Sequence, residues 1–325
     1  MTPSILGVVV IGRNEGDRLG RCLRSAHAGA ALTVYVDSGS SDDSVALART
    51  LGADVLALDM NSPFTAARAR NAGFARLHHL LPGLLYVQFV DGDCELIDGW
   101  LPAAGRFLDD HADVAVVCGR LRERFPQRSV YNLLCDMEWN LPAGETRACG
   151  GIAMMRAAAL AAVGGFNESL IAGEEPELCV RLRARGARIW RLADDMAWHD
   201  AAMLRFGQWW RRAQRSGHAF AEGAALHGAP PERHYVSEVR RAVLWGAALP
   251  LLAAALALAD ARWLALLLLY PAQVLRLAWR DGIGRRERRW GALFMVLARF
   301  PEAQGVFKFW LDRFRGQRSG LIEYK

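Results

Sequence analysis

Two aspartates separated by one glycine form the sharpest chemical pattern in the sequence. Asp91-Gly92-Asp93 directly follows the apolar run Leu84–Val90, which has the composition of a buried strand. Side chains at i and i+2 of an extended segment point the same way, so both carboxylates can face one ion. Carboxylate oxygens suit Mg²⁺ or Mn²⁺, and such an ion keeps open positions for the oxygens of a diphosphate. The pattern predicts a metal and diphosphate site, although Asp-x-Asp is also common in ordinary polar turns.

Strands and helices alternate along the chain at the spacing of a doubly wound α/β fold. In such a fold ligands bind beyond the carboxyl ends of the strands, so the loops 12–16, 37–43 and 91–95 should converge on one cleft. Residues 120–147 fit neither period and are predicted to form a lid or acceptor loop. The predicted strands are 5–11, 33–36, 54–58, 84–90, 113–118, 152–156 and 188–192, and predicted helices follow Asn14 and cover 44–51, 64–80, 98–111, 157–163 and 174–185.

An ordered set of short motifs gives the chain a family resemblance. The motifs are VVVIGRNE (8–15), VDSGSSDD (36–43), ARNAG (69–73), FVDGD (89–93), GG (150–151) and GEEPELCVR (173–181). Over roughly residues 5–220 the chain resembles the family-two glycosyltransferases. The resemblance implies a GT-A fold with a mostly parallel sheet, a nucleotide-diphosphate sugar donor, a Mg²⁺ or Mn²⁺ cofactor and inversion at the anomeric carbon.

The same resemblance assigns the donor-binding side chains. Asp37 ends a predicted strand, where its carboxylate could accept hydrogen bonds from a uracil or ribose, or simply cap the following turn. Ser38 stands where the family often has a second acid, so the base preference stays open. Arg70 has a guanidinium suited to phosphate or base edges. The expected nucleotide-sugar site comprises Asn14, Glu15, Asp37, Arg70, Asp91 and Gly151.

The acid pair Glu174-Glu175 supplies the expected catalytic base. One carboxylate takes the proton from the acceptor hydroxyl as that oxygen attacks the sugar. The family usually has Glu-Asp here, so we prefer Glu175 and keep Glu174 as the second candidate; acids in the first turn of a helix also stabilise its dipole without any catalytic role. His199 follows the last predicted strand, and the expected metal ligands are Asp91, Asp93 and His199, with a structural histidine as the alternative.

The C-terminal region differs from the rest of the chain in charge and hydropathy. The 325 residues carry a formal net charge of +6, but residues 1–239 sum to −3 and residues 240–325 to +9, so the pI of about 9.2 does not indicate nucleic-acid binding. Residues 243–259 and 263–279 are apolar, about 26 Å long as helices, and flanked by arginines. They predict a membrane hairpin or a buried helical pair, in a C-terminal region 223–325 that follows a GT-A domain of residues 1–222.

These patterns predict an enzyme at the cytoplasmic face of a membrane. The six scattered cysteines show neither zinc-ligand spacing nor a disulfide framework, and they indicate a reducing compartment. We expect an inverting glycosyltransferase with a lipid-linked or saccharide acceptor in cell-surface glycan or glycolipid synthesis, associated peripherally or by two passes. A nucleotidyltransferase and an inactive membrane-docked protein of the same fold are the alternatives.

Overall fold

The structure is a computed structural model that describes residues 5–281, 284–317, 320 and 322. The chain groups into two compact units, which are described separately. The first unit comprises Met1–Arg124, Glu138–Leu170 and Glu174–Ala201, and the second comprises Phe125–Met137, Ile171–Gly173 and Ala202–Lys325. The second unit therefore begins its main segment at Ala202, whereas the sequence places the start of the C-terminal region at residue 223.

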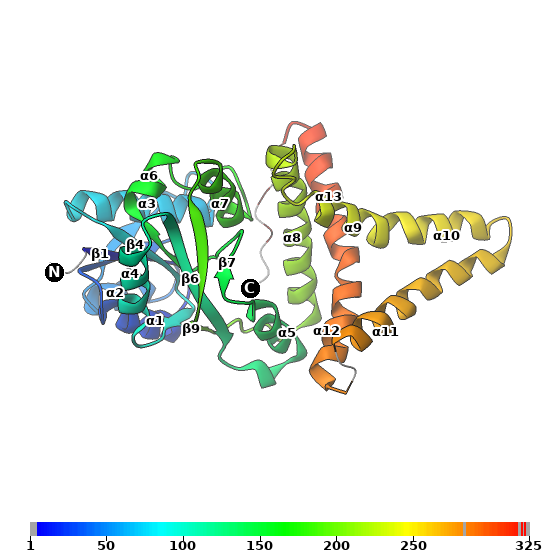
Figure 1. Ribbon diagram of the computed structural model, residues 1–325, viewed down its shortest axis with the longest axis horizontal. Helices are drawn as coiled ribbons and strands as arrows, with labels where there is room; N and C mark the ends of the chain where they lie inside the picture. The colour runs from blue at the N-terminus through cyan, green and yellow to red at the C-terminus, as the bar shows by residue number, and fades with distance from the viewer. Residues whose placement is uncertain (1–4, 282–283, 318–319, 321, 323–325) are drawn as a thin grey trace. The chain divides into compact units, whose positions relative to one another are not determined.

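One sheet forms the centre of the first unit (Figure 1). Within the described residues its strand order is β3-β2-β1-β4-β8-β6-β9-β5, with β7 paired to β9. The strands are β1 (Leu6–Gly12), β2 (Leu32–Asp37), β3 (Asp54–Ala57), β4 (Tyr86–Asp91), β5 (Cys94–Leu96), β6 (Val114–Glu123), β7 (Gly144–Glu145), β8 (Ala153–Arg156) and β9 (Arg188–His199). The helices of this unit are α1 (Asp17–His27), α2 (Ser44–Thr50), α3 (Ala66–Leu80), α4 (Trp100–Asp110), α6 (Ala157–Ala162) and α7 (Glu174–Ala184).

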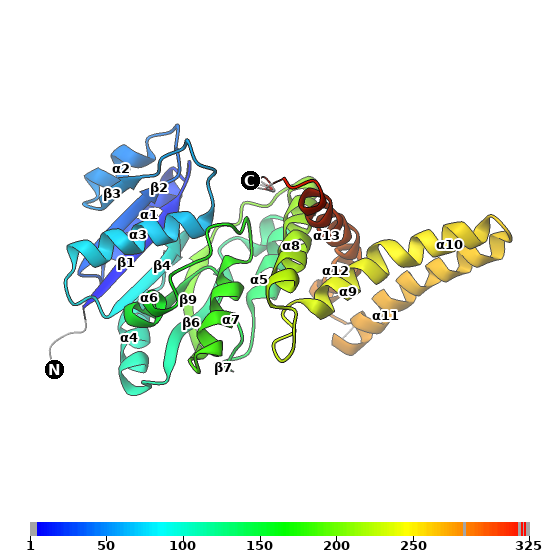
Figure 2. The same cartoon turned by 90° about the horizontal axis from the view of Figure 1, so that it is seen from above.

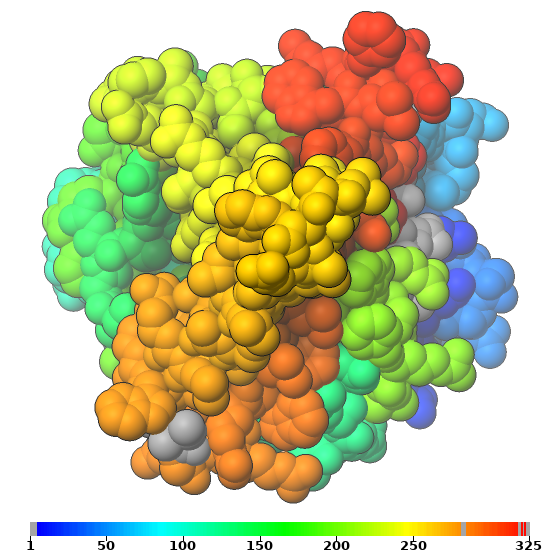
Figure 3. Space-filling view, turned by 90° about the vertical axis from the view of Figure 1, so that its right-hand side faces the viewer, coloured from blue at the N-terminus to red at the C-terminus, as the bar shows by residue number. Residues whose placement is uncertain are grey.

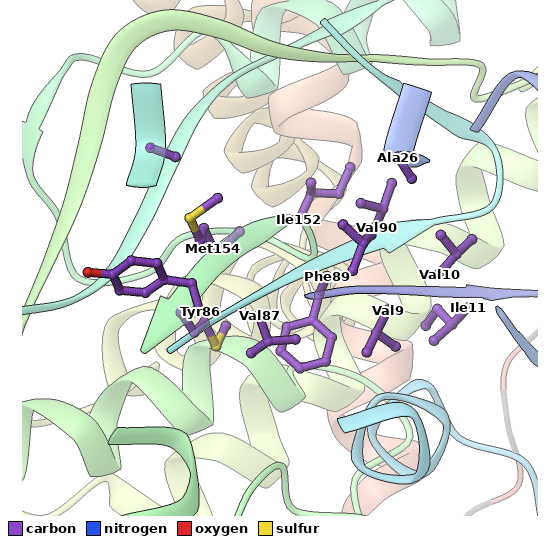
Figure 4. Packing of buried hydrophobic residues seen from close by; sticks show 14 of the residues in the cluster. Val9, Val10, Ile11, Ala26, Tyr86, Val87, Phe89, Val90, Ile152 and Met154 are labelled. Atoms are coloured by element: carbon purple, nitrogen blue, oxygen red, sulfur yellow. The ribbon is translucent and has the colours of Figure 1, made fainter. Parts of the chain in front are cut away.

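The central strands are buried on both faces because their side chains are apolar at nearly every position. Val9 and Val10 on β1 stand opposite Phe89 and Val90 on the parallel strand β4, and all four are fully or almost fully buried. Figure 4 shows Val10 and Val90 projecting to one side of the sheet and Val9 and Phe89 to the other. On the Val9 side Gly73 of α3 packs so closely that a Cβ there would lie 2.4 Å from Val9 Cγ1.

The sheet is less parallel than the sequence predicts. The pairs among β3, β2, β1 and β4 are parallel, as expected for a doubly wound fold. Beyond β4 the strand β8 runs antiparallel to both β4 and β6, and β9 is antiparallel to β5 and β7. Strands β6 and β9 are again parallel, so the result is a mixed sheet.

Part of the predicted lid is strand. β6 runs on to Glu123 and pairs with β9, which is itself seven residues longer than the predicted strand 188–192. The register between them shifts near Gly119, where a Cβ would come within 2.7 Å of Asp194 O. This irregularity and the alternating arginines of 120–124 interrupt the hydrophobic pattern that predicts a strand, so the sequence does not predict the end of β6. The remaining polar stretch holds a 3₁₀ turn, Pro126–Arg128, and α5 (Val130–Trp139).

The second unit is helical. Its helices after residue 201 are α8 (Phe206–His227), α9 (Val236–Val243), the π-turn η2 (Leu244–Ala248), α10 (Leu249–Ala257), the 3₁₀ segment η3 (Ala261–Leu268), α11 (Leu269–Asp281), α12 (Arg286–Leu297) and α13 (Arg299–Phe314). Helices α8 and α13 touch through glycines: a Cβ at Gly217 would meet Glu302 O at 2.0 Å, and one at Gly305 would meet Gln214 O at 2.0 Å. Small residues thus bring the two backbones together, a packing that is common between membrane helices.

The apolar segments of the second unit form a helical hairpin that the described chain leaves uncovered. Residues Val236–Ala257 and Ala261–Arg280 are long and apolar enough to cross a membrane, by length and composition, and only 11% of the most apolar window of each is buried. Helix α10 packs against η3, and Figure 1 shows α10 and α11 diverging away from the turn that joins the two arms. Figure 2 shows the same hairpin from above, and in Figure 3 its yellow and orange atoms face the viewer. A buried helical pair, the alternative prediction, would be covered by other side chains.

Candidate functional site

The first two polar loops are tied together at the carboxyl ends of β1 and β2. Asn14 adopts a left-handed backbone, with φ at 56°, and donates its N–H to Ser40 Oγ at 3.0 Å. Its side-chain Oδ1 accepts from the N–H of Ser41 at 2.8 Å. Because both contacts join residues more than 25 positions apart, Asn14 fixes the loop 12–16 against the loop 37–43. The structure thus brings these two predicted loops together.

Asp37 holds its own turn. Its Oδ2 accepts hydrogen bonds from the N–H groups of Gly39 and Ser40, both at 3.0 Å, and its Oδ1 accepts from the Tyr35 hydroxyl at 3.0 Å. The residue is 4% exposed. Burial, followed by the charge of Asp37, raises the pKa of Tyr35, so the phenol stays a donor. Most of the accepting capacity of Asp37 is therefore used inside the protein.

Arg70 joins two acids that lie far apart in the sequence. Its Nη2 donates to Asp91 Oδ1 at 2.8 Å and its Nη1 to Glu174 Oε1 at 2.6 Å. The arginine side chain is 3% exposed, whereas that of Asp91 is 37% exposed. Burial alone lowers the pKa of Arg70, but the charges of Asp91 and Glu174 raise it above its ordinary value. The cation is thus fixed between two carboxylates, with the Asp91 end open to solvent.

Two glycines let the backbone approach these side chains. A Cβ on Gly151 would lie 3.0 Å from Arg70 Nη2 and 3.2 Å from Asp91 Oδ2. A Cβ on Gly92 would lie 3.1 Å from Glu15 Cγ and 3.2 Å from the carbonyl oxygen of Ile11. The predicted donor residues Glu15, Arg70, Asp91 and Gly151 therefore share one sheet edge.

Asp91 and Asp93 do not lie on one extended segment, which corrects the reasoning from the sequence. The chain turns at Gly92, whose N–H donates to Ile11 O at 2.8 Å, between the end of β4 and the start of β5. As a result Asp91 bonds Arg70, while Asp93 is buried and lies 3.2 Å from His199 Nε2. The rule that side chains at i and i+2 face the same way fails here because it requires an extended backbone.

Asp93 and His199 form the core of a candidate cation site. The side chains of Asp93, Cys94 and His199 each place a ligand atom within 4.8 Å of the others; Asp91 is not in this group. His199 Nδ1 lies 3.7 Å from Glu123 Oε2, and the Trp139 ring contacts the imidazole edge-on at 4.6 Å. A carboxylate behind the second nitrogen of a ligand histidine is a common support in metal sites.

The residues fit a divalent cation that accepts oxygen and nitrogen. Asp93 supplies a buried carboxylate and His199 an imidazole nitrogen on the same side, and His199 Nδ1 is buried without a hydrogen-bond partner. Mn²⁺ accepts both donor types, whereas Mg²⁺ prefers oxygen alone. Asp93 and His199 would hold the ion.

Glu174 and Glu175 point into different surroundings although they are adjacent at the start of α7. Glu174 binds Arg70, as described above. Glu175 is 5% exposed, and its Oε1 accepts from the N–H of Cys149 at 2.6 Å and from the thiols of Cys149 at 2.8 Å and Cys179 at 3.0 Å. Burial raises the pKa of Glu175, and these hydrogen bonds oppose the rise only in part.

Sequence reasoning missed four residues around the site: Glu123, Trp139, Cys149 and Cys179. Glu123 lies in the stretch predicted as a lid, so the sequence did not predict its position on β6, close to His199 Nδ1. Cys149 and Cys179 are 30 positions apart and match no metal-ligand spacing. The signal that could have found Cys149 is its position immediately before Gly150-Gly151, a motif already placed at the site.

Comparisons with known proteins identify a related sequence family and a related fold. The family model described as Glycosyl transferase family 2 matches residues 7–161. The succinoglycan biosynthesis protein ExoU of Rhizobium meliloti (strain 1021) is 31% identical over 204 residues, which cover 57% of this chain and 59% of that relative. A solved mannosyltransferase, PcManGT from Pyrobaculum calidifontis, in complex with GDP-Man and Mn²⁺, superimposes with a TM-score of 0.65 at 22% identity, covering 95% of this chain and 87% of that one. The likeness confirms the GT-A fold.

Proposed function

We propose that this chain moves a sugar from a nucleotide-diphosphate donor to an acceptor hydroxyl, with inversion at the anomeric carbon, because residues 7–161 match the model of glycosyl transferase family 2. The observation that carries the proposal is the Arg70 bridge between Asp91 and Glu174. It fixes a guanidinium at the same sheet edge as the loops tied by Asn14, and a guanidinium is suited to phosphate oxygens. The site thus pairs a cationic group with carboxylates that can bind sugar and ribose hydroxyls.

Asp93 and His199 are the ligands that we assign to the metal. When bound, a divalent cation at this place would offset the charge that develops on the departing nucleoside diphosphate. Asp91, fixed by Arg70, faces the donor beside Gly151. Asn14 and Asp37 shape the nucleotide side of the site, and Glu15 lies between that side and Gly92.

Glu175 is the base that we assign to the acceptor proton. Its raised pKa increases its affinity for that proton, which favours transfer from a hydroxyl. Three donors from Cys149 and Cys179 converge on Oε1 and hold the carboxylate in place. Glu174 has a different part: it holds Arg70 in place.

A screen of nucleotide sugars tests the function directly. Purified protein is incubated with Mn²⁺ or Mg²⁺ and individual nucleotide sugars, starting with GDP-mannose because the solved neighbour binds it. Release of nucleoside diphosphate is measured, and the anomeric configuration of any product is read by nuclear magnetic resonance. Turnover that Asp93→Asn abolishes would support the proposal. Turnover that survives in Asp93→Asn would remove the metal assignment, and a product of retained configuration would exclude inversion.

Paired variants separate the roles of the two glutamates. Glu175→Gln keeps the shape and removes the base, so we expect kcat to fall by about 10²–10⁴-fold with little change in donor affinity. Glu174→Gln weakens the Arg70 bridge, so we expect the larger effect on the KM for the donor. The reverse pattern would move the base to Glu174.

We further propose that the hairpin places the enzyme on the cytoplasmic face of a membrane, where a lipid-linked or saccharide acceptor is glycosylated for a cell-surface glycan. Leu258, Leu268 and Trp279 of the hairpin are 91%, 66% and 77% exposed, and arginines flank both helices. Basic flanks favour anionic lipid on the cytoplasmic side. Flotation with anionic vesicles, followed by a carbonate wash, tests this: complete release by carbonate would exclude an inserted hairpin.

A further inference from the structure

Glu175, Cys149 and Cys179 form a compact cluster next to Gly150-Gly151. In the proposed transfer Glu175 is the base, and the two cysteines are only its hydrogen-bond donors. Glu175 and Cys179 are one turn apart on α7, and Cys149 comes from the segment before β8. Cys149, Cys179 and Glu175 are 3%, 0% and 5% exposed. Their ligand atoms all lie within 4.8 Å of one another, and Cys149 and Cys179 are free cysteines.

The spacing of the two sulfurs is that of a tetrahedral metal site. Two thiolates bound to Zn²⁺ at about 2.3 Å lie about 3.8 Å apart when the angle between the bonds is tetrahedral. Cys149 Sγ and Cys179 Sγ are 3.8 Å apart. A carboxylate oxygen on the same ion would lie about 3.5 Å from each sulfur. Glu175 Oε1 is now 2.8 Å and 3.0 Å from them, so it would withdraw by roughly half an ångström.

The donor set selects a different class of metal from the Asp93 and His199 pair. Thiolates favour Zn²⁺, Cd²⁺ and other thiophilic ions, whereas Mg²⁺ and Mn²⁺ favour oxygen. Burial raises the pKa of the Cys149 thiol well above its ordinary value. At Cys179 the hydrogen bond with Cys149 lowers the pKa, but burial and the charge of Glu175 outweigh it and raise the pKa above its ordinary value. Such thiols stay protonated until a cation supplies the compensating charge.

A third thiol lies nearby. Burial raises the pKa of Cys118 to about 12, and the charges of Glu175 and Cys179 contribute to that rise. Cys118 Sγ donates to Trp190 O at 3.6 Å. Cys118 is not in the group whose ligand atoms all lie within 4.8 Å of one another, so a fourth position on an ion bound there is left to water.

We propose that Cys149, Cys179 and Glu175 form a binding site for a thiophilic divalent cation, Zn²⁺ or Cd²⁺, and that its occupation withdraws Glu175 from the transfer reaction. The first half stands on geometry alone; the second half rests on the proposed function. Binding forms two metal–sulfur bonds and one metal–oxygen bond. It releases both thiol protons to solvent, together with the Glu175 proton where that group is protonated.

Cadmium titration of the full chain tests the site. Cd²⁺ is added in the presence of excess Mg²⁺, and the ultraviolet charge-transfer band of the cadmium–thiolate bond is recorded. We expect the band in the wild type and its loss in Cys149→Ser/Cys179→Ser, with Cd²⁺ binding weakened by more than the ~10–100-fold that loss of outer-shell partners causes. Cys22→Ser/Cys135→Ser removes two buried thiols elsewhere and should keep the band. Cys94→Ser should also keep it, which excludes the thiol beside His199.

Two results would overturn the site: an undiminished band in Cys149→Ser/Cys179→Ser, or loss of the band in Cys94→Ser. If the double variant does not fold, the wild type still answers the question. Cd²⁺ should protect Cys149 and Cys179, and not Cys22 or Cys135, from alkylation in mild denaturant, as read by peptide mass spectrometry. Equal labelling of all four cysteines with and without Cd²⁺ would refute the proposal.

Activity measurements test the second half. With Mg²⁺ saturating, micromolar Zn²⁺ should inhibit the wild type reversibly and leave Cys149→Ser/Cys179→Ser far less affected. The cadmium band is recorded without turnover. It therefore tests the metal site even if the chain does not catalyse the proposed transfer. Cadmium binding without inhibition would refute the withdrawal of Glu175 and speak against its role as base.

Discussion

Arg70 Nη1 lies 2.6 Å from Glu174 Oε1, although the two residues are 104 positions apart in the chain. The same guanidinium reaches Asp91, so a helix after the third strand locks the end of β4 to the start of α7. The planar guanidinium holds its donors in a fixed fork that fits both carboxylates, whereas a lysine ammonium is a compact charge with rotatable donors.

Replacing Arg70 by Lys should therefore disable the site while keeping its charge. We expect kcat/KM for the donor to fall by about 10–100-fold, or roughly 1.4–2.7 kcal/mol of transition-state stabilisation. Arg76→Lys is the matched control, because Arg76 makes a two-bond ion pair with Asp54 near the surface. Steady-state kinetics of both variants measure this. An equal loss of kcat/KM in Arg76→Lys would show that the Arg70 bridge does not contribute specifically to the reaction.

Glu123 should tune metal binding without touching the metal. It lies 3.7 Å from His199 Nδ1, and its Oε2 also accepts from the N–H of Ala201 at 3.1 Å. Glu123→Gln removes the negative charge behind the imidazole, so we expect Mn²⁺ affinity to fall by about 10–100-fold. Electron paramagnetic resonance of free Mn²⁺ measures this without turnover. Glu145→Gln, a change on the exposed strand β7, should leave the affinity unchanged; a loss there as large as in Glu123→Gln would point to a general charge effect.

Gly151 should tolerate no side chain. A methyl group at this position would press on Arg70 Nη2 at 3.0 Å and Asp91 Oδ2 at 3.2 Å, so we expect Gly151→Ala to lower the free energy of unfolding by about 1–3 kcal/mol and to reduce donor affinity. Gly105→Ala is the control, since Gly105 lies inside α4 with nothing within 4 Å of an added Cβ. It should stabilise the protein by roughly 0.5–1 kcal/mol. Urea unfolding and donor titration compare the two, and equal behaviour would contradict the crowding.

Two buried groups of the helical unit, Glu222 and His218, should make the free energy of unfolding depend on pH. Burial raises the pKa of Glu222 to about 7, while burial lowers that of the neighbouring His218 to about 4. Between pH 4.5 and 7 the folded chain keeps a proton on Glu222 that the unfolded chain releases, so this group makes stability fall as pH rises. His218 acts in the opposite sense between pH 4 and 6.5, because only the unfolded chain binds its proton.

Glu222→Gln should remove the first of these two trends. Relative to the wild type, its free energy of unfolding should grow by about 1–2 kcal/mol between pH 4.5 and pH 7, after allowance for solvent screening. Chemical unfolding at several pH values provides the comparison. A constant difference across that range would mean that Glu222 titrates normally.

Much of the fold was within reach of the sequence because its signals are local. The apolar run at 5–11 predicted β1 to within one residue. The helix predicted to follow Asn14 begins at Asp17, with Gly16 and not Asn14 at its N-cap. The strand extension at 119–123 was not predictable, because the bulge beside Gly119 and the alternating arginines break the hydrophobic period that marks a strand.

The site was only partly predictable for the same reason. Arg70, Asp91, Glu174 and Glu175 could be named from motifs, but which acid the arginine would bind depends on how α3 and α7 pack. The divergence of Asp91 and Asp93 follows from a hydrogen bond between Gly92 and a strand 81 positions earlier. Long-range partners of this kind leave no trace in local composition.

Asn14 joins the loops 12–16 and 37–43, which we propose to bind the nucleotide. The Asn14 side chain accepts a hydrogen bond from the Ser41 N–H, and its backbone is left-handed. These two features fix the conformation of both loops without a bound donor. A preorganised binding site loses little conformational entropy when the donor binds, so shape complementarity decides which nucleotide base it accepts. Variants that relax this junction should accept a wider range of donors, each held more weakly.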